Sequence, residues 1–377
     1  MPALAFATNF LWVMVIGLLG PSLPAMVADL GITYAQAGFF FTLLSFGSLI
    51  GTSLGAIGSD YLSRKLLYGA CVLVLSAGLF VLGLMPSYLL VALVIFLLSL
   101  TGSPIGAIGQ SIMLGMFPGK REKYLSYMTF FGAIGNLVAP VVVSLNFTAS
   151  LSWRWPFIET SMLAFIVFIA LFATPIPSAA PVHRPEKLST IIRNRGVLSS
   201  AALIFFSVGA DLGFSYWLAE YFKSELHASL RMSSSVVGVY LVGIIMGRIL
   251  VPVFLKRISA RANLIMGLGI ALASIIPFIL VPSVPLKIAL CALYGFGIGP
   301  VFPLLVARGS REFPSQSGAV TGVLYGCMSL GGMTFPLLVG ALAGSAGIAR
   351  SYFFCAAVAC GLLVAVIAGR GQRLQST

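Results

Sequence analysis

Charge is scarce in this chain: charged residues make up 8% of its 377 residues, and 9 of them are acidic. There are 2 histidines, His183 and His227, and they stand far apart, so a histidine-based metal or catalytic site has no support. The 5 cysteines lack the paired spacing of a disulfide framework or a metal site. No Gly-Lys-Ser/Thr phosphate-binding motif is present, which argues against an ATP-driven pump. We therefore expect no cofactor, no bound metal and no enzymatic activity.

Hydrophobic residues, in contrast, make up 59% of the chain, and its mean hydropathy is +1.07. Apolar stretches of about 20 residues, the length that spans a hydrocarbon core, recur along the whole sequence. This pattern predicts an all-α membrane protein with twelve transmembrane helices. The expected spans are about 4–28, 35–59, 66–84, 88–116, 124–149, 156–174, 197–222, 232–255, 262–281, 285–308, 316–343 and 349–369.

The net charge of +13 reflects membrane topology and not a nucleic-acid partner. Of the 22 basic residues, sixteen fall on the same side of the expected spans as the termini and five on the other, among them Lys287. Basic residues concentrate in cytoplasmic loops, where they also meet anionic lipid. We therefore expect a multi-pass protein of the cell inner membrane with both termini in the cytoplasm.

The chain also reads as a duplication. A polar, proline-rich linker at 175–195 separates an expected six-helix bundle at 1–174 from a second at 196–377. Features of the first bundle recur in the second at a nearly constant offset, such as Phe117-Pro118 with Phe313-Pro314, and Pro140 with Pro336. A repeat of six spans keeps its orientation, which predicts parallel repeats with a solute site between them near the midplane.

The loop between the second and third spans resembles the signature of the major facilitator superfamily. It reads Asp60-Tyr-Leu-Ser-Arg64-Lys65, in which Asp60, Arg64 and Lys65 match the family pattern. The resemblance implies a gating role for these three residues and covers the whole chain. Neighbouring positions depart from the signature: Ala56, Tyr61 and Ser63.

A narrower resemblance is to the fucose-permease branch of sugar–proton symporters. It rests on Gly209-Ala-Asp211 followed by Trp217 and Tyr221, and on similar glycine-rich segments of the fourth, fifth and tenth spans. That branch often has acids in its first and fourth spans and an Asn in the fourth. Here Gly106 and Gln110 occupy the span-four positions.

Asp211 is the candidate proton-coupling residue. A carboxylate in mid-span is costly, so such residues usually face a cavity and have a function. Ser207 and Ser215 lie four residues before and after it and form a polar ribbon with it on one helix face. The alternative is a structural Asp that is hydrogen-bonded to a neighbouring helix.

Arg248 is the one basic residue well inside an expected span. It has three open roles: it reaches the cytoplasmic surface, it forms a salt bridge with Asp211, or it contacts an anionic solute.

Neutral polar residues complete the candidate solute-binding set. Amides and phenols on apolar walls suit hydroxyl-rich solutes, although each alone is more often a contact between helices. Trp217 is either a ligand contact or an anchor at the membrane surface. Glu159 and Glu220 lie near span ends, where we expect water to reach them, and we assign them no chemistry. The neutral candidates are Gln110, Asn136, Trp217, Tyr294 and Tyr325.

These features predict a secondary transporter that imports a small polar, sugar-like solute with a proton by alternating access. We expect a monomer in the lipid bilayer whose partners are the solute and protons. One alternative is proton-coupled efflux or exchange of an amphipathic or anionic compound. Another is a membrane sensor that carries no solute, which the absence of a signalling domain disfavours.

Overall fold

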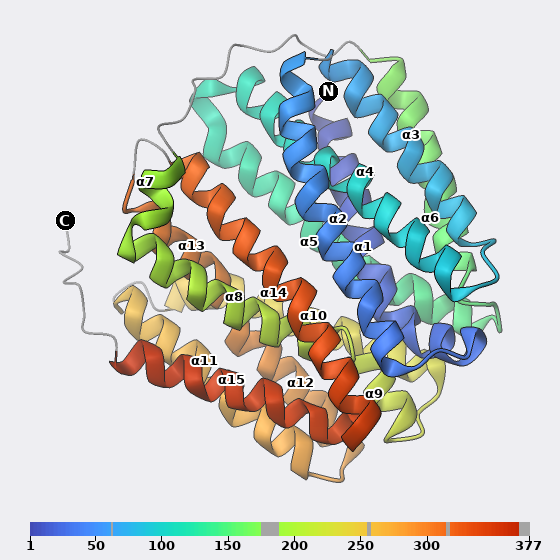
Figure 1. Cartoon of the computed structure of the whole chain (residues 1–377), viewed down its shortest axis with the longest axis vertical. Helices are drawn as coiled ribbons and strands as arrows, with labels where there is room; N and C mark the ends of the chain where they lie inside the picture. The colour runs from blue at the N-terminus through green and yellow to red at the C-terminus, as the bar shows by residue number, and fades with distance from the viewer. Residues whose placement is uncertain (62, 175–187, 255–257, 314–316, 369–377) are drawn as a thin grey trace.

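The computed structural model describes residues 1–377 except 62, 175–187, 255–257, 314–316 and 369–377. The described chain is helical throughout (Figure 1). Met1 and the end of the last helix lie on one side of the molecule, here called the termini side, and the opposite side is called the far side. The helices are α1 (Pro2–Leu30), α2 (Tyr34–Tyr61), α3 (Arg64–Leu82), α4 (Tyr88–Met116), η1 (Pro118–Lys120), α5 (Arg121–Thr148), α6 (Trp155–Phe172), α7 (Leu188–Arg193), α8 (Arg195–Ser215), α9 (Leu218–Ser224), α10 (Leu230–Phe254), α11 (Ala260–Leu280), α12 (Val284–Ile298), α13 (Val301–Ser310), α14 (Ser317–Ala346) and α15 (Ile348–Ala368).

Within these described residues, 12 helical segments are long and apolar enough to cross a membrane, as predicted. Two of the spans are broken, which the apolar runs did not predict. The span Arg195–Ser224 bends between α8 and α9, and the span Val284–Ser310 breaks between α12 and α13. Pro300 lies at the second break and has no backbone N–H for a helical hydrogen bond, so the sequence itself interrupts that helix.

The spans form two bundles of six (Figure 1). In the first, α1 packs on α5, α2 on α4, and α3 on α6; in the second, α8 packs on α14, α10 on α12, and α11 on α15. This arrangement confirms the predicted all-α fold with two parallel six-span repeats. Of the expected linker, residues 175–187 lie outside the described chain, and the rest includes α7.

The repeat is visible where the bundles meet. There α2 packs on α14, and α10, the counterpart of α2, packs on α5, the counterpart of α14. A Cβ built on Gly38 of α2 would lie 3.0 Å from the Pro336 carbonyl oxygen of α14. A Cβ on Gly238 of α10 would lie 3.6 Å from Cγ of Pro140 on α5. Each interface therefore places a glycine of one bundle against the matching proline of the other, and small residues let the backbones approach.

Hydrogen bonds join the two bundles in the part of the spans nearer the far side. From the first bundle, Tyr34 Oη donates to Glu220 Oε1 at 3.0 Å, and Thr42 Oγ1 donates to the Met333 carbonyl at 2.7 Å. From the second bundle, Ser234 Oγ donates to the Pro21 carbonyl at 2.9 Å. The hydroxyls of Ser144 and Ser235, one from each bundle, share a hydrogen bond of 2.8 Å. The bundles are thus closed against each other on the far side.

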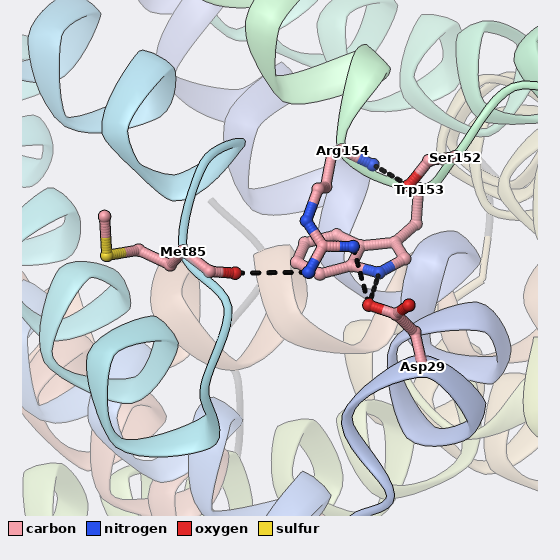
Figure 2. Close-up of polar contacts among 5 residues, drawn as sticks. All are labelled: Asp29, Met85, Ser152, Trp153 and Arg154. Carbon is pink, nitrogen blue, oxygen red and sulfur yellow. Dashed lines mark hydrogen bonds and ion pairs between the residues drawn. The ribbon is translucent and has the colours of Figure 1, made fainter.

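A separate cluster holds the far side of the first bundle together (Figure 2). Arg154 Nη1 lies 2.6 Å from Asp29 Oδ2, which also accepts a hydrogen bond from Trp153 Nε1 at 3.1 Å. The same guanidinium stacks on the Trp153 ring and donates to the Met85 carbonyl at 3.2 Å. These contacts tie α1 to the loops before α4 and before α6, all within one bundle.

Lys287 is a buried charge near the far side of the second bundle. It lies in the first turn of α12 and is 2% exposed. Its ammonium donates to Tyr221 Oη at 2.7 Å and to the carbonyl of Phe278, close to the end of α11. A cation at the C-terminal end of a helix is favourable, so Lys287 stabilises the junction of α11 and α12.

Candidate functional site

A polar pocket lies within the second bundle, where α8, α10 and the junction of α12 and α13 meet. The apolar walls come from the aliphatic side chains and one aromatic ring, and the polar groups come from α8 and α10. Its lining residues are Ser207, Val208, Asp211, Ile244, Arg248, Ile298, Gly299, Val301 and Phe302.

Asp211 is half-buried at the centre of this lining. Tyr240 of α10 donates a hydrogen bond to its Oδ1. The helical spacing brings Ser207 into the same pocket, with its Oγ donating to the Ile204 carbonyl at 3.4 Å. Ser215 is buried one turn further along α8 and is not among the residues that line the pocket. Ser207, Asp211 and Ser215 thus share one face of α8, and a phenol from the next span contacts Asp211.

Arg248 lines the same pocket but makes no ion pair with Asp211 among the described contacts. Its Nε donates to the Gly299 carbonyl at 3.1 Å. In a regular helix this carbonyl would accept from the residue four positions on, which is Pro303 and has no N–H. Arg248 thus satisfies a carbonyl that the proline leaves without a partner, and it brings a cation to the broken span.

Two of the predicted tyrosines lie around the pocket. Tyr294 of α12 is 1% exposed and stacks on Tyr240 with ring centroids 6.3 Å apart, and its hydroxyl has no hydrogen-bond partner among the described residues. Tyr325 of α14 is 46% exposed and packs edge-on against Phe302, with centroids 5.4 Å apart. Tyr294 therefore supports Tyr240 from behind, whereas Tyr325 extends the Phe302 wall.

The family model of the Major Facilitator Superfamily matches residues 5–333. The chain belongs to this superfamily. It is thus a secondary transporter of small solutes and not an enzyme.

Relatives of this transporter include the uncharacterized MFS-type transporter YfkL of Bacillus subtilis, which is 21% identical over 332 residues, 86% of this chain and 83% of the relative. Protein TsgA of Salmonella typhimurium is 22% identical over 313 residues, 81% of this chain and 78% of TsgA. Among solved structures, a mutant of the nucleoside transporter NupG has a TM-score of 0.81 at 18% identity, covering 98% of both chains. A bacterial homolog of the human lysosomal transporter Spinster, in an inward-facing and occupied conformation, has a TM-score of 0.76 at 15% identity, covering 97% of this chain and 95% of that one. These structures share the transporter's fold.

The predicted residues of the first bundle do not line this pocket. Gln110 is exposed on α4. Asn136 of α5 packs against α1, where a Cβ on Gly17 would lie 2.6 Å from its Oδ1. Both are neutral, and their role in solute binding stays a prediction.

Trp217 also lies away from the pocket. It is fully buried, and its Nε1 donates to the Pro336 carbonyl at 2.9 Å. Its ring meets Tyr34 of the first bundle edge-on, with centroids 5.5 Å apart. The structure thus places Trp217 where the transporter's bundles close, and not at the membrane surface.

Of the predicted gating residues, Asp60 lies in the last turn of α2 and Arg64 begins α3, with side chains outside the described part of the structure. Lys65 Nζ lies 5.5 Å from the centroid of the Phe172 ring on α6. For the part of the chain described, no cluster of three or more His, Cys, Asp or Glu side chains is placed to hold a metal ion.

The two span-end acids differ in their surroundings. Glu159 is exposed, as expected, and accepts a hydrogen bond from Asn146 Nδ2 at 3.0 Å. Glu220 is only 4% exposed, so the expectation that water reaches it is wrong for this conformation. The helices of the opposite bundle cover it, which its sequence position did not indicate.

Sequence reasoning also missed Tyr240, Gly299 and Phe302. A signal for Tyr240 was present, because Tyr240, Ile244 and Arg248 follow one another at intervals of four and share one face of α10. A signal for Gly299 was the proline four residues later.

Proposed function

We propose that this transporter imports a small polar organic solute together with a proton, and that Asp211 binds the proton. The observation that carries the proposal is a carboxylate in the middle of a span, held by Tyr240 in a pocket that also contains Arg248. An acid in such a site exchanges protons with the pocket without exposing charge to lipid.

The solute in this proposal is sugar-like and lies between the bundles. Ser207, Arg248 and Tyr325 contact it from the second bundle, and Gln110 and Asn136 from the first. The buried Ser215 and Tyr294 act by supporting the pocket from behind. Hydroxyl and amide groups orient a hydroxyl-rich solute without requiring it to carry charge. The resemblance to sugar–proton symporters and the shared fold with a nucleoside transporter both support a hydroxyl-rich substrate. Trp217 acts through the closing interface that it occupies.

Transport proceeds in this proposal by rocking of the bundles 1–174 and 196–377 about the linker 175–195. The positive-inside rule places the termini side in the cytoplasm of a bacterial cell, with the transporter a monomer in the inner membrane. The far-side hydrogen bonds then make this conformation closed to the outside. Asp60, Arg64 and Lys65 act as a gate on the cytoplasmic side.

Efflux or exchange of an anionic or amphipathic compound is the second candidate. It is favoured by Arg248, which lines the pocket without an ion pair to Asp211. A guanidinium with free donors recognises carboxylates and phosphates.

The test begins with a thermal-shift screen of the purified transporter against sugars, nucleosides, organic acids and amphipathic drugs, because a ligand stabilises the state that it binds. Stabilising compounds are then assayed in proteoliposomes with an imposed proton gradient and with that gradient collapsed. Uptake of a neutral hydroxylated compound that requires the gradient supports the proposal. Gradient-driven movement of anionic compounds alone supports the second candidate, and no flux of any stabilising compound contradicts both.

A further inference from the structure

Glu220 of α9 forms an unusual contact between the bundles. Its Oε1 accepts a hydrogen bond from Tyr34 Oη of α2 at 3.0 Å. Its Oε2 is buried and has no hydrogen-bond partner within the described structure. One of the two carboxyl oxygens therefore has a hydrogen-bond partner, and that partner belongs to the opposite bundle.

No cation compensates this carboxyl group among the described side chains. Lys223, one turn further along, is close enough to interact electrostatically but makes no ion pair with it. Two other cations at this end are already engaged: Lys287 donates to Tyr221 and to the end of α11, and Arg154 pairs with Asp29. Besides Glu220, the ionisable residues on α9 and just after it are Tyr221, Lys223, Glu225 and His227. The elements packed against α9 add Asp29 on α1, Arg195 and Asp211 on α8, Tyr216 directly after α8, and Arg231, Tyr240 and Arg248 on α10. The helix α2, which supplies Tyr34, also carries Asp60 and Tyr61 at its other end.

The energetic consequence follows from the two states of the transporter. A buried carboxylate without a paired cation is costly by several kcal/mol, and a buried neutral carboxyl group costs much less. When the bundles separate on the far side, Tyr34 leaves and water reaches Glu220, so the charged form is well solvated. Closure therefore favours the protonated form and opening favours the charged form.

We propose that Glu220 is a second proton-binding site, separate from Asp211, which takes a proton from the far-side solution when the bundles close there. It returns this proton to the same solution when they open. The inference rests on the alternating access of the proposed function and not on proton import, because the Glu220 proton does not cross the membrane. By linkage, low pH shifts the transporter toward far-side closure and high pH toward far-side opening.

The experiment measures the far-side distance between the bundles as a function of pH. Ser87 and Ser283 are exposed far-side residues, one in each bundle, and neither side chain caps its helix. Spin labels on Ser87→Cys and Ser283→Cys, in a chain whose 5 native cysteines are replaced by serine or alanine, report this distance by pulsed electron paramagnetic resonance. Between about pH 5 and about pH 9, the closed-to-open ratio should fall by up to about tenfold per pH unit over part of the range, the limit for one linked proton. A ratio that does not change with pH overturns the proposal without any further variant.

Glu220→Gln keeps an oxygen that accepts from Tyr34 but removes this titration, so its closed population should be high and should change much less with pH. Glu159→Gln is the matched control, an exposed acid at the same end bonded within its own bundle, and should respond to pH like the parent. Tyr34→Phe keeps the acid and should also keep a pH response. An unchanged response in Glu220→Gln, or a lost one in either other variant, overturns the assignment. If the Glu220 assignment is wrong, gradient-driven uptake is unaffected. If proton import through Asp211 is wrong, the pH response of the far-side distance is unaffected.

Discussion

The two bundles share one fold but differ in the polar contacts between their helices. In the second, α8 and α10 are linked by a carboxylate and a phenol, Asp211 and Tyr240. In the first, α1 and α5 are linked by an amide and a carbonyl, with Asn9 Nδ2 donating to Met128 at 2.7 Å. The packing repeats in both bundles, but a carboxylate in mid-span occurs on α8 and not on α1, its counterpart in the first bundle. We therefore expect proton binding to depend on the second bundle.

The substitution Asp211→Asn carries the largest expected effect, because it removes the mid-span carboxylate that distinguishes the second bundle from the first. At a membrane potential of about 100 mV, one coupled proton supplies roughly 2.3 kcal/mol, which is an accumulation ratio of about 50 for a neutral solute. We expect that ratio to fall to about one, while exchange of solute without a gradient is partly retained. Uptake into proteoliposomes, with and without the gradient, measures both, and undiminished accumulation in the variant contradicts the assignment.

Arg248→Ala tests whether the second bundle also selects the charge of the solute. Charge-assisted hydrogen bonds contribute about 1.5–3 kcal/mol. If Arg248 contacts an anion, the affinity for anionic ligands should fall at least about tenfold and that for neutral ligands much less. Thermal-shift titrations compare the two classes, and Arg248→Lys should restore part of the difference. An equal loss for both classes instead indicates the structural contact with Gly299.

Tyr240→Phe removes the phenol and leaves the acid. The hydrogen bond from Tyr240 orients the Asp211 carboxyl group in the pocket, so its loss should slow proton binding and release. Gradient-driven uptake into proteoliposomes should therefore slow by about tenfold or less, the value of one hydrogen bond, while the accumulation ratio stays above one. A ratio that falls to one in Tyr240→Phe would show instead that coupling requires the phenol itself.

Asn136→Ala and Gln110→Ala carry the smallest expected effect, because each removes one uncharged hydrogen-bonding group of the first bundle. Each should raise the solute concentration for half-maximal uptake by about tenfold or less, the value of one neutral hydrogen bond. The accumulation ratio in the gradient should stay at the parent value. A reduced ratio in either variant would show that the first bundle also couples the proton.

Much of the fold was predictable, because span length and apolar character are local properties. The expected segment 232–255 corresponds to α10 (Leu230–Phe254), and 156–174 to α6 (Trp155–Phe172). The bend at Tyr216 and Trp217 was not predictable in this way, because apolar residues continue through it and the partners of Trp217 lie on α2 and α14.

The part of the site that lies on one helix was predictable from the sequence. The contacts between side chains of different helices were not. Ser207, Asp211 and Ser215 follow from helical spacing alone. The partner of Asp211 depends on how α8 meets α10, and the burial of Glu220 depends on Tyr34 of the other bundle. Positions near span ends carried no information about which helix would cover them.

Coupled entry of solute and protons through Asp211 can be tested in de-energised proteoliposomes with a solute found in the screen. Solute is added to a weakly buffered medium, and the external pH is recorded. We predict that the medium becomes alkaline as protons enter with the solute, and that Asp211→Asn abolishes this change while solute exchange continues. Acidification of the medium, no pH change with the parent chain, or an unchanged signal with Asp211→Asn would contradict it.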